Sequence, residues 1–291
     1  MAGIPAHDNT MDENNNLTRI AILDMNAGEP NEGMRCIQSL VIEFLQSPGL
    51  SGNFRVFEVR VQNDLPEIEN FDIFISSGGP GTPEKEGKAW EKHYAHLLDD
   101  IWDYNLKGGA KKYLFLICHS YQLACLHWKL GKVTKRKSTA FGVMPVHLTA
   151  KGRKEPLLEG LSDPFFAVDS RDFQLIQPKK EALLERGSSI VCMEKIRPHI
   201  ALERAVMGIR FSDEIFGVQF HPEADSEGMS MYFQKPEKRE LIIKHHGKRK
   251  YLDMLEHLDD EDKILRTNRT IIPRFLRLAT DALNKAKLKT V

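Results

Sequence analysis

One cysteine stands where a buried strand is predicted to turn into a helix. Five apolar residues, Tyr113–Ile117, lead into Cys118, and a segment with helical spacing follows it. An entirely apolar run of this length is typical of a parallel strand that is covered on both faces. A sharp strand-to-helix turn raises the side chain at the turn above the sheet and directs the free N–H groups of the helix at a ligand. Cys118 is therefore predicted to be a nucleophile whose thiolate the positive helix end stabilises.

A histidine and a glutamate follow another predicted strand. His221-Pro222-Glu223 comes directly after the predicted strand 215–220. A cysteine and a histidine supply a nucleophile and its general base, and a carboxylate beyond the histidine fixes its tautomer and stabilises the imidazolium. The intervening proline restricts the backbone between the two side chains. We predict that Cys118, His221 and Glu223 form a catalytic triad.

A glycine-rich loop is predicted at the same edge of the sheet. Residues 78–81 read Gly-Gly-Pro-Gly and follow the predicted strand 71–75. Glycines carry no Cβ, so the backbone of such a loop can approach a ligand closely. One N–H group from this loop and the N–H group of His119 are predicted to form an oxyanion hole, in which one donor typically contributes ~3 kcal/mol in the transition state.

The elements that must position these residues alternate between strands and helices. This alternation predicts an α/β fold with a doubly wound, mostly parallel sheet and flanking helices, whose ligands lie beyond the carboxyl ends of the strands. After Gly131 the pattern changes to short strands separated by turns, which we expect to add antiparallel strands. The expected strands are 19–24, 54–59, 71–75, 113–117, 142–148, 165–168, 189–193, 205–209 and 215–220, with early helices over 31–46 and about 90–101.

The composition excludes several classes of protein. The 291 residues contain 41 Lys and Arg against 41 Asp and Glu, so the net charge gives no reason to expect a nucleic-acid partner. Four scattered cysteines do not suggest a disulfide scaffold or a zinc site, and we expect no metal and no cofactor. No apolar run approaches the ~18 residues of a membrane span, and no signal peptide is visible, so we expect a cytoplasmic protein without a membrane partner.

The chain is predicted to have three parts. Residues 1–17 are polar and are expected to be a disordered tail. Residues 18–233 form the predicted catalytic domain. Residues 234–291 form a C-terminal helical extension with two amphipathic helices, one around 252–258 and one around 275–282. We expect these helices to pack on the domain or to form a surface for a partner.

Together these motifs resemble the class I, or triad-type, glutamine amidotransferases over roughly residues 19–224. The elbow Gly-aliphatic-Cys-x-Gly-x-Gln of that family is matched at Cys118 and Gln122, although Leu116 and Ser120 replace its two glycines. Its Gly-x-Gln-x-His-Pro-Glu motif is matched by residues 217–223, and its Ser-Gly-Gly-Pro loop by residues 77–80. A stretch resembling Ser-His-x-Asp spans residues 170–172, where Arg171 replaces the usual histidine.

The resemblance implies a flavodoxin-like fold of the class I amidotransferases. It also implies an enzyme that hydrolyses the side-chain amide of glutamine through a thioester. It implies an oxyanion hole made by Gly79 and His119. The implied substrate contacts are Gly81, Gln122, Ser170 and Asp172. The roughly 65 residues after Glu223 are too few for an acceptor domain. Ammonia would therefore pass to a separate synthase partner, and the sequence specifies neither the acceptor nor the oligomeric state.

Three alternatives remain open from the sequence. A γ-glutamyl peptidase or hydrolase on the same scaffold would cleave γ-glutamyl compounds larger than glutamine. Intracellular proteases of the PfpI type also carry Cys-His at the elbow, but the stretch 217–223 argues against them. A non-catalytic regulatory subunit could keep the fold, and the replacements at Leu116 and Ser120 leave that alternative open.

Overall fold

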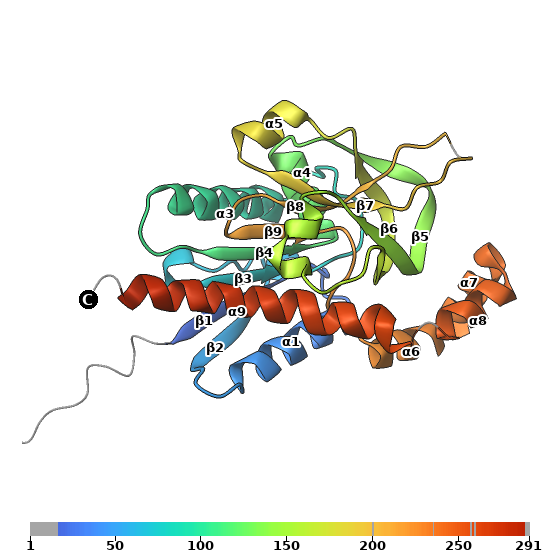
Figure 1. Ribbon diagram of the computed structural model, residues 1–291, viewed down its shortest axis with the longest axis horizontal. Helices are drawn as coiled ribbons and strands as arrows, with labels where there is room; N and C mark the ends of the chain where they lie inside the picture. Colours follow the sequence, from blue (N-terminus) through green and yellow to red (C-terminus); the bar gives the residue numbers. More distant parts are fainter. Residues whose placement is uncertain (1–16, 200, 235, 257, 259, 289–291) are drawn as a thin grey trace, which may run out of the picture.

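The computed structural model describes residues 17–288 except 200, 235, 257 and 259. The predicted disordered tail, residues 1–17, lies outside the described residues apart from Leu17. The described chain forms a mixed sheet flanked by helices (Figure 1). The strands are β1 (Thr18–Asp24), β2 (Gly52–Glu58), β3 (Ile73–Ser76), β4 (Tyr113–Ile117), β5 (Lys132–Leu148), β6 (Phe165–Ile176), β7 (Ser189–Glu194), β8 (Val206–Arg210) and β9 (Ile215–Val218).

Nine α-helices are found among the described residues, together with shorter helical turns. The α-helices are α1 (Glu32–Leu45), α2 (Val59–Gln62), α3 (Ala89–Leu106), α4 (His119–His127), α5 (Lys180–Glu185), α6 (Ser226–Gln234), α7 (Pro236–His246), α8 (Lys248–Glu256) and α9 (Arg266–Leu288). The shorter turns are η2 (Ile68–Asn70), η3 (Gly152–Lys154), η4 (Pro156–Leu158) and η5 (Glu261–Leu265).

The strand order is β2-β1-β3-β4-β9-β8-β7-β5-β6. The first five strands in this order pair in parallel, and β8, β7, β5 and β6 add antiparallel pairs. The prediction of a parallel core with antiparallel additions is confirmed. In this topology β4 and β9 are neighbours, so the residues that follow them, Cys118 and His221, lie at the same edge of the sheet.

The central strands β4 and β9 contain almost only apolar residues because both faces of the sheet are covered. Along β4, Phe115 and Ile117 face the core that includes α1 and α9, whereas Leu114 and Leu116 face the core that includes α3 and α4. In Figure 1, α9 crosses the sheet on one side and α3 lies on the other. The helix α9 therefore packs on the sheet although it belongs to the predicted C-terminal extension.

The hairpin of β5 and β6 is longer than the sequence pattern indicated. We expected a strand over 142–148, but β5 begins at Lys132 and pairs with β6 along most of its length, with an irregularity between Lys135 and Ala140. Its first half is polar and largely exposed, so it lacks the apolar alternation that marks a half-buried strand. A third core of apolar side chains joins this hairpin to the region α6–α8, with Val143 and Val168 packed near Phe233, Ile242 and Tyr251.

Candidate active site

The backbone turns sharply at Cys118, as the sequence predicts. Its φ of 47° and ψ of −96° lie outside the regions that residues with a Cβ normally occupy. Hydrogen bonds hold this strained turn on both sides: the Cys118 N–H donates to the Val218 carbonyl at 2.8 Å, and the Gln122 N–H donates to the Cys118 carbonyl at 3.0 Å. The turn is therefore fixed by β9 and by the first turn of α4, and it holds a side chain that is only 5% exposed.

His221 and Glu223 lie beside this cysteine. The His221 N–H donates to the Val168 carbonyl of β6 at 2.8 Å, which fixes the backbone just beyond β9. The His221 Nδ1 lies 2.8 Å from Glu223 Oε1, and the imidazole is close enough to Cys118 for the sulfur to raise the pKa of His221. Because Glu223 engages Nδ1, the other ring nitrogen is left to exchange a proton with the thiol. The structure thus brings the three residues of the predicted triad together.

The charges around His221 favour its protonated form. Burial lowers the pKa of His221, but the negative charge of Glu223 and the Cys118 sulfur outweigh burial, and the pKa lies well above its usual value of 6.5. Glu223 is 1% exposed and faces the first turn of α1, since a Cβ placed on Gly33 would lie 3.1 Å from Glu223 Oε1. The positive end of that helix stabilises the buried carboxylate.

The Gly-Gly-Pro-Gly loop lies over the Cys118–His221 pair. A Cβ placed on Gly78 would lie 2.8 Å from His221 Cε1 and 3.5 Å from Cys118 Cβ. A Cβ placed on Gly79 would lie 2.1 Å from the Met25 carbonyl oxygen. No real Cβ fits at either distance, so both glycines are required for the loop to approach the pair this closely.

An arginine connects this loop to the segment that follows β1. Arg60 Nη1 donates to the Pro80 carbonyl at 2.6 Å and to the Met25 carbonyl at 3.1 Å. Its guanidinium group also lies over the ring of Trp90, at 5.1 Å from the ring centroid. This side chain was not expected from the sequence, because Arg60 lies outside every motif that was matched there.

His119 contributes an uncharged imidazole close to the loop. It begins α4, its side chain is buried, and its Nε2 has no hydrogen-bond partner among the described residues. Burial, and to a smaller extent the positive charge of Arg60, lowers the pKa of His119 to about 4. The His119 ring is therefore neutral at pH 7, and the group available for the predicted oxyanion hole is its backbone N–H at the helix end.

A glutamine that sequence reasoning did not single out lies against the thiol. Gln219 Nε2 donates to Cys118 Sγ at 3.5 Å, and Gln219 Oε1 accepts from Gln122 Nε2 at 3.0 Å. The thiol itself lies 3.8 Å from the Ser170 carbonyl oxygen. A side-chain amide donor at the sulfur stabilises a thiolate. The signal for Gln219 was present, because it is the glutamine of the stretch 217–223.

The four predicted substrate contacts are placed differently from one another. The Gln122 side chain is buried, bonded to Gln219 and to the Phe173 carbonyl, and Ser170 offers its carbonyl to the thiol. Gly81 is exposed with a φ of 92°, and the exposed Asp172 accepts a hydrogen bond from Thr139. The structure therefore brings Gln122 and Ser170 to the cysteine, and the roles of all four residues in substrate binding stay predictions.

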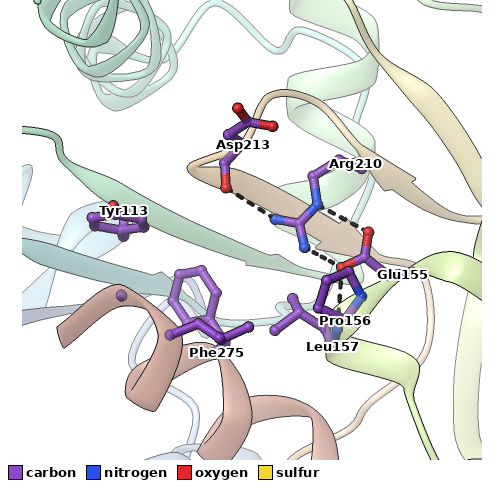
Figure 2. Close-up of a pocket in the computed structure, with 9 residues that line it drawn as sticks. Tyr113, Glu155, Pro156, Leu157, Arg210, Asp213 and Phe275 are labelled. Carbon is purple, nitrogen blue, oxygen red and sulfur yellow. Dashed lines mark hydrogen bonds and ion pairs between the residues drawn. The ribbon is translucent and has the colours of Figure 1, made fainter. Parts of the chain in front are cut away.

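A cavity of about 240 Å³ lies away from this constellation (Figure 2). It is lined in part by Tyr113, the first residue of the strand β4 that leads to Cys118, and by Phe275 of α9. Arg210 in its wall is bonded to Glu155 and to the Asp213 carbonyl. The cavity is therefore at the opposite end of β4 from the candidate site and contributes no residue to it.

Two negative findings apply to the described part of the chain. Among its residues, no group of three or more His, Cys, Asp or Glu side chains is arranged to hold a metal ion. No helix in the same part is long and apolar enough to cross a membrane.

Comparisons with known proteins find the same fold in several solved structures. Among solved structures, a glutamine amidotransferase from Thermotoga maritima superposes with a TM-score of 0.63 at 14% identity, covering 91% of this chain and 98% of that chain. A glutamine amido transferase from Methylobacillus flagellatus gives a TM-score of 0.63 at 16% identity, covering 92% and 94%. The glutaminase domain of Trypanosoma brucei CTPS, with bound acivicin, gives 0.54 at 12% identity, covering 73% and 88%.

At these identities the likeness establishes the fold, and family membership comes from the sequence. The sequence matches none of the curated proteins compared with it. The family model "Glutamine amidotransferase class-I" matches residues 46–237, which is more than half of the chain and includes Cys118, His221 and Glu223. The chain therefore belongs to the class-I glutamine amidotransferase family.

Proposed function

We propose that the protein hydrolyses the side-chain amide of glutamine to glutamate and ammonia with Cys118, His221 and Glu223. One observation supports this most strongly: a strained elbow presents Cys118 to an imidazole that is itself bonded to a buried glutamate. A Cys–His pair oriented by a carboxylate is the arrangement of a nucleophilic acyl transfer.

In the proposed reaction the Cys118 thiolate attacks the carbonyl carbon of the glutamine side chain. The N–H groups of Gly79 and His119 stabilise the oxyanion of the tetrahedral intermediate. Protonated His221 gives its proton to the leaving nitrogen, so the carbon–nitrogen bond breaks and ammonia leaves a γ-glutamyl thioester. Neutral His221 then takes a proton from water, the hydroxide attacks the thioester, and glutamate leaves as the thiolate is restored.

The raised pKa of His221 suits the first of these steps. An imidazolium is present above pH 6.5 because Glu223 and the thiolate stabilise it. The Gln219 amide at 3.5 Å from the sulfur stabilises the charged nucleophile from the other side. We also propose that the ammonia released here is used by a separate synthase partner.

The test is ammonia and glutamate release from glutamine by purified protein. Cys118→Ala is expected to lose turnover without a change in circular dichroism. Cys125→Ala is the matched control, because Cys125 is a fully buried cysteine of α4, the helix that follows Cys118, and the proposed reaction does not use it. Turnover that survives Cys118→Ala would remove the assigned nucleophile.

The same assay separates the two substrate classes. γ-Glutamyl-p-nitroanilide and a γ-glutamyl dipeptide are offered beside glutamine at equal concentrations. A higher kcat/KM for the larger compounds would replace glutaminase by γ-glutamyl hydrolase as the assignment, and no turnover of any of them would indicate a non-catalytic protein.

A further inference from the structure

A buried chain of hydroxyl groups connects the nucleophile helix to the glycine loop. Ser120 Oγ, from α4, lies 2.6 Å from the Ser77 carbonyl oxygen and 2.7 Å from Ser76 Oγ at the end of β3. Ser76 Oγ in turn lies 2.8 Å from the Tyr94 hydroxyl of α3. Ser76, Ser120 and Tyr94 are each at most 2% exposed. We call Tyr94, Ser76 and Ser120 the hydroxyl chain.

The hydrogen bonds of the hydroxyl chain run in one direction. A carbonyl oxygen only accepts, so Ser120 donates its single proton to the Ser77 carbonyl. Ser76 must then donate to Ser120, and Tyr94 must donate to Ser76. Burial raises the pKa of Tyr94 to about 12, so the phenol keeps its proton at neutral pH. Three aligned O–H groups polarise one another and strengthen the last bond, which holds the Ser77 carbonyl.

That carbonyl belongs to the first of two successive peptide groups leading to Gly79. The second peptide group is also held, because Ser77 Oγ lies 2.8 Å from the Gly78 carbonyl oxygen and accepts from the Met25 N–H at 2.9 Å. In a trans peptide the C=O and N–H point in opposite directions. Fixing the Gly78 carbonyl on Ser77 Oγ therefore directs the Gly79 N–H the other way.

The loop that these bonds fix is the one that covers the catalytic pair. A Cβ on Gly78 would lie 2.8 Å from His221 Cε1, so even a small rotation of the loop changes its fit against the imidazole. An oxyanion hole works because its donors are already oriented before charge develops. The hydroxyl of Ser120 supplies one of the two hydrogen bonds that set this orientation.

We propose that Ser120 is a positioning residue that holds the glycine loop in the orientation that stabilises the oxyanion. Ser76 and Tyr94 support it by donating hydrogen bonds along the hydroxyl chain. This inference rests on the proposed amide hydrolysis, and it assigns a role to a side chain at a position where the related elbow motif has glycine. Ser120 acts through the loop and does not touch the substrate.

The experiment compares wild type, Ser120→Ala and Tyr94→Phe, with Ser188→Ala as the matched control. Ser188 is a buried serine whose hydroxyl donates to the Phe211 carbonyl at 2.7 Å. It belongs neither to the elbow at Cys118 nor to the glycine loop. Four quantities are measured: kcat, KM for glutamine, the rate of Cys118 alkylation by iodoacetamide, and inhibition by the γ-aldehyde analogue of glutamine, which adds to the thiolate to form a tetrahedral oxyanion.

Ser120→Ala is expected to change the direction of the Gly79 N–H without removing that donor. We therefore expect kcat and the affinity for the aldehyde to fall by about 10- to 100-fold, somewhat less than for loss of an oxyanion donor. KM and the alkylation rate should stay within about twofold, because the thiolate is untouched. Tyr94→Phe should lower kcat and the affinity for the aldehyde by a smaller factor. If Ser120→Ala does not fold, Tyr94→Phe is the variant that tests the proposal. Ser188→Ala should leave all four unchanged.

Equal aldehyde affinity in wild type and Ser120→Ala would overturn the proposal, and so would an alkylation rate that falls in step with kcat. If the wild-type protein releases no ammonia from glutamine, the proposed function is wrong. The aldehyde affinities still decide the role of Ser120 in that case, because they require only the nucleophile and the loop.

Discussion

The side-chain amide of Asn268, in the C-terminal helix α9, donates a hydrogen bond of 2.8 Å to the backbone carbonyl of Glu223, which lies 45 residues earlier in the chain. On the preceding residue, Thr267 Oγ1 donates to the Phe166 carbonyl of β6 at 2.6 Å. The start of α9 is thereby bonded both to the turn that carries the candidate triad carboxylate and to the strand beside it. A segment outside the matched motifs thus contributes to the geometry of the site.

This bond predicts a positional role for Asn268. Asn268→Ala should lower the free energy of unfolding by about 1–2 kcal/mol, because a buried carbonyl loses its partner, and glutaminase kcat should fall by about tenfold as Glu223 and His221 shift. Asn105→Ala is the matched control: Asn105 is equally buried, at 8% exposed, and its amide bonds both backbone groups of Lys112. Urea denaturation and steady-state kinetics check both variants, and equal loss of kcat in the two would contradict the positional role.

The carboxylate of Glu223 is predicted to set the titration of His221. Glu223→Gln removes the negative charge that raises the pKa of His221, so that pKa should fall and the alkaline limb of kcat/KM should move to lower pH. An NMR titration of the His221 Cε1–H signal measures the change directly. An unchanged midpoint would mean that Glu223 does not stabilise the imidazolium.

The same raised pKa predicts how stability depends on pH. Protonated His221 is favoured in the folded state, so its contribution to stability is fully present below pH 6.5 and is lost as the pH rises through the higher folded pKa. The difference in unfolding free energy between wild type and His221→Gln should therefore be larger at pH 6 than at pH 10. A difference that grows with pH would reverse the sign and contradict the assignment.

The glycine at position 79 is predicted to be irreplaceable. A Cβ there would meet the Met25 carbonyl at 2.1 Å, a backbone atom that cannot swing away. Gly79→Ala should displace the loop and reduce kcat by at least about 100-fold, the effect of losing one oxyanion donor. Gly49→Ala, which meets nothing within 4 Å but has a φ of 80°, should cost only about 1 kcal/mol of stability and leave kcat unchanged. Melting curves and kinetics of the two variants test this contrast.

The helix α9 is predicted to be essential for folding of the whole domain. Phe275 is 3% exposed, and its ring centroid lies 5.1 Å from that of Phe115 in β4. Phe275→Ala should lower the free energy of unfolding by about 3–5 kcal/mol. Leu278→Ala, at a residue of the same helix that is 43% exposed, should cost less than about 1 kcal/mol. A single urea transition with a reduced midpoint is expected, and two separate transitions would mean that α9 folds on its own.

The amino-acid sequence by itself determined the parallel core and the candidate catalytic groups. Tyr113–Ile117 is apolar without interruption because both faces of β4 are buried, and that pattern is local and can be read residue by residue. The elbow at Cys118 and the stretch ending in Glu223 were also visible, because each depends on a few consecutive residues. What the sequence missed locally was the first half of β5, whose polar residues lie in an exposed hairpin and leave no apolar alternation.

Only the tertiary structure decided which distant groups support that chemistry. Nothing in the spacing of Asn268 links it to Glu223, and nothing in the run around Tyr94 links it to Ser76 and Ser120. A hydrogen bond needs two atoms within about 3 Å, and chain folding alone brings residues this far apart in sequence to that distance. The sequence thus identified the candidate reactive side chains, and the packing of α3, α4 and α9 on the sheet determined how they are held.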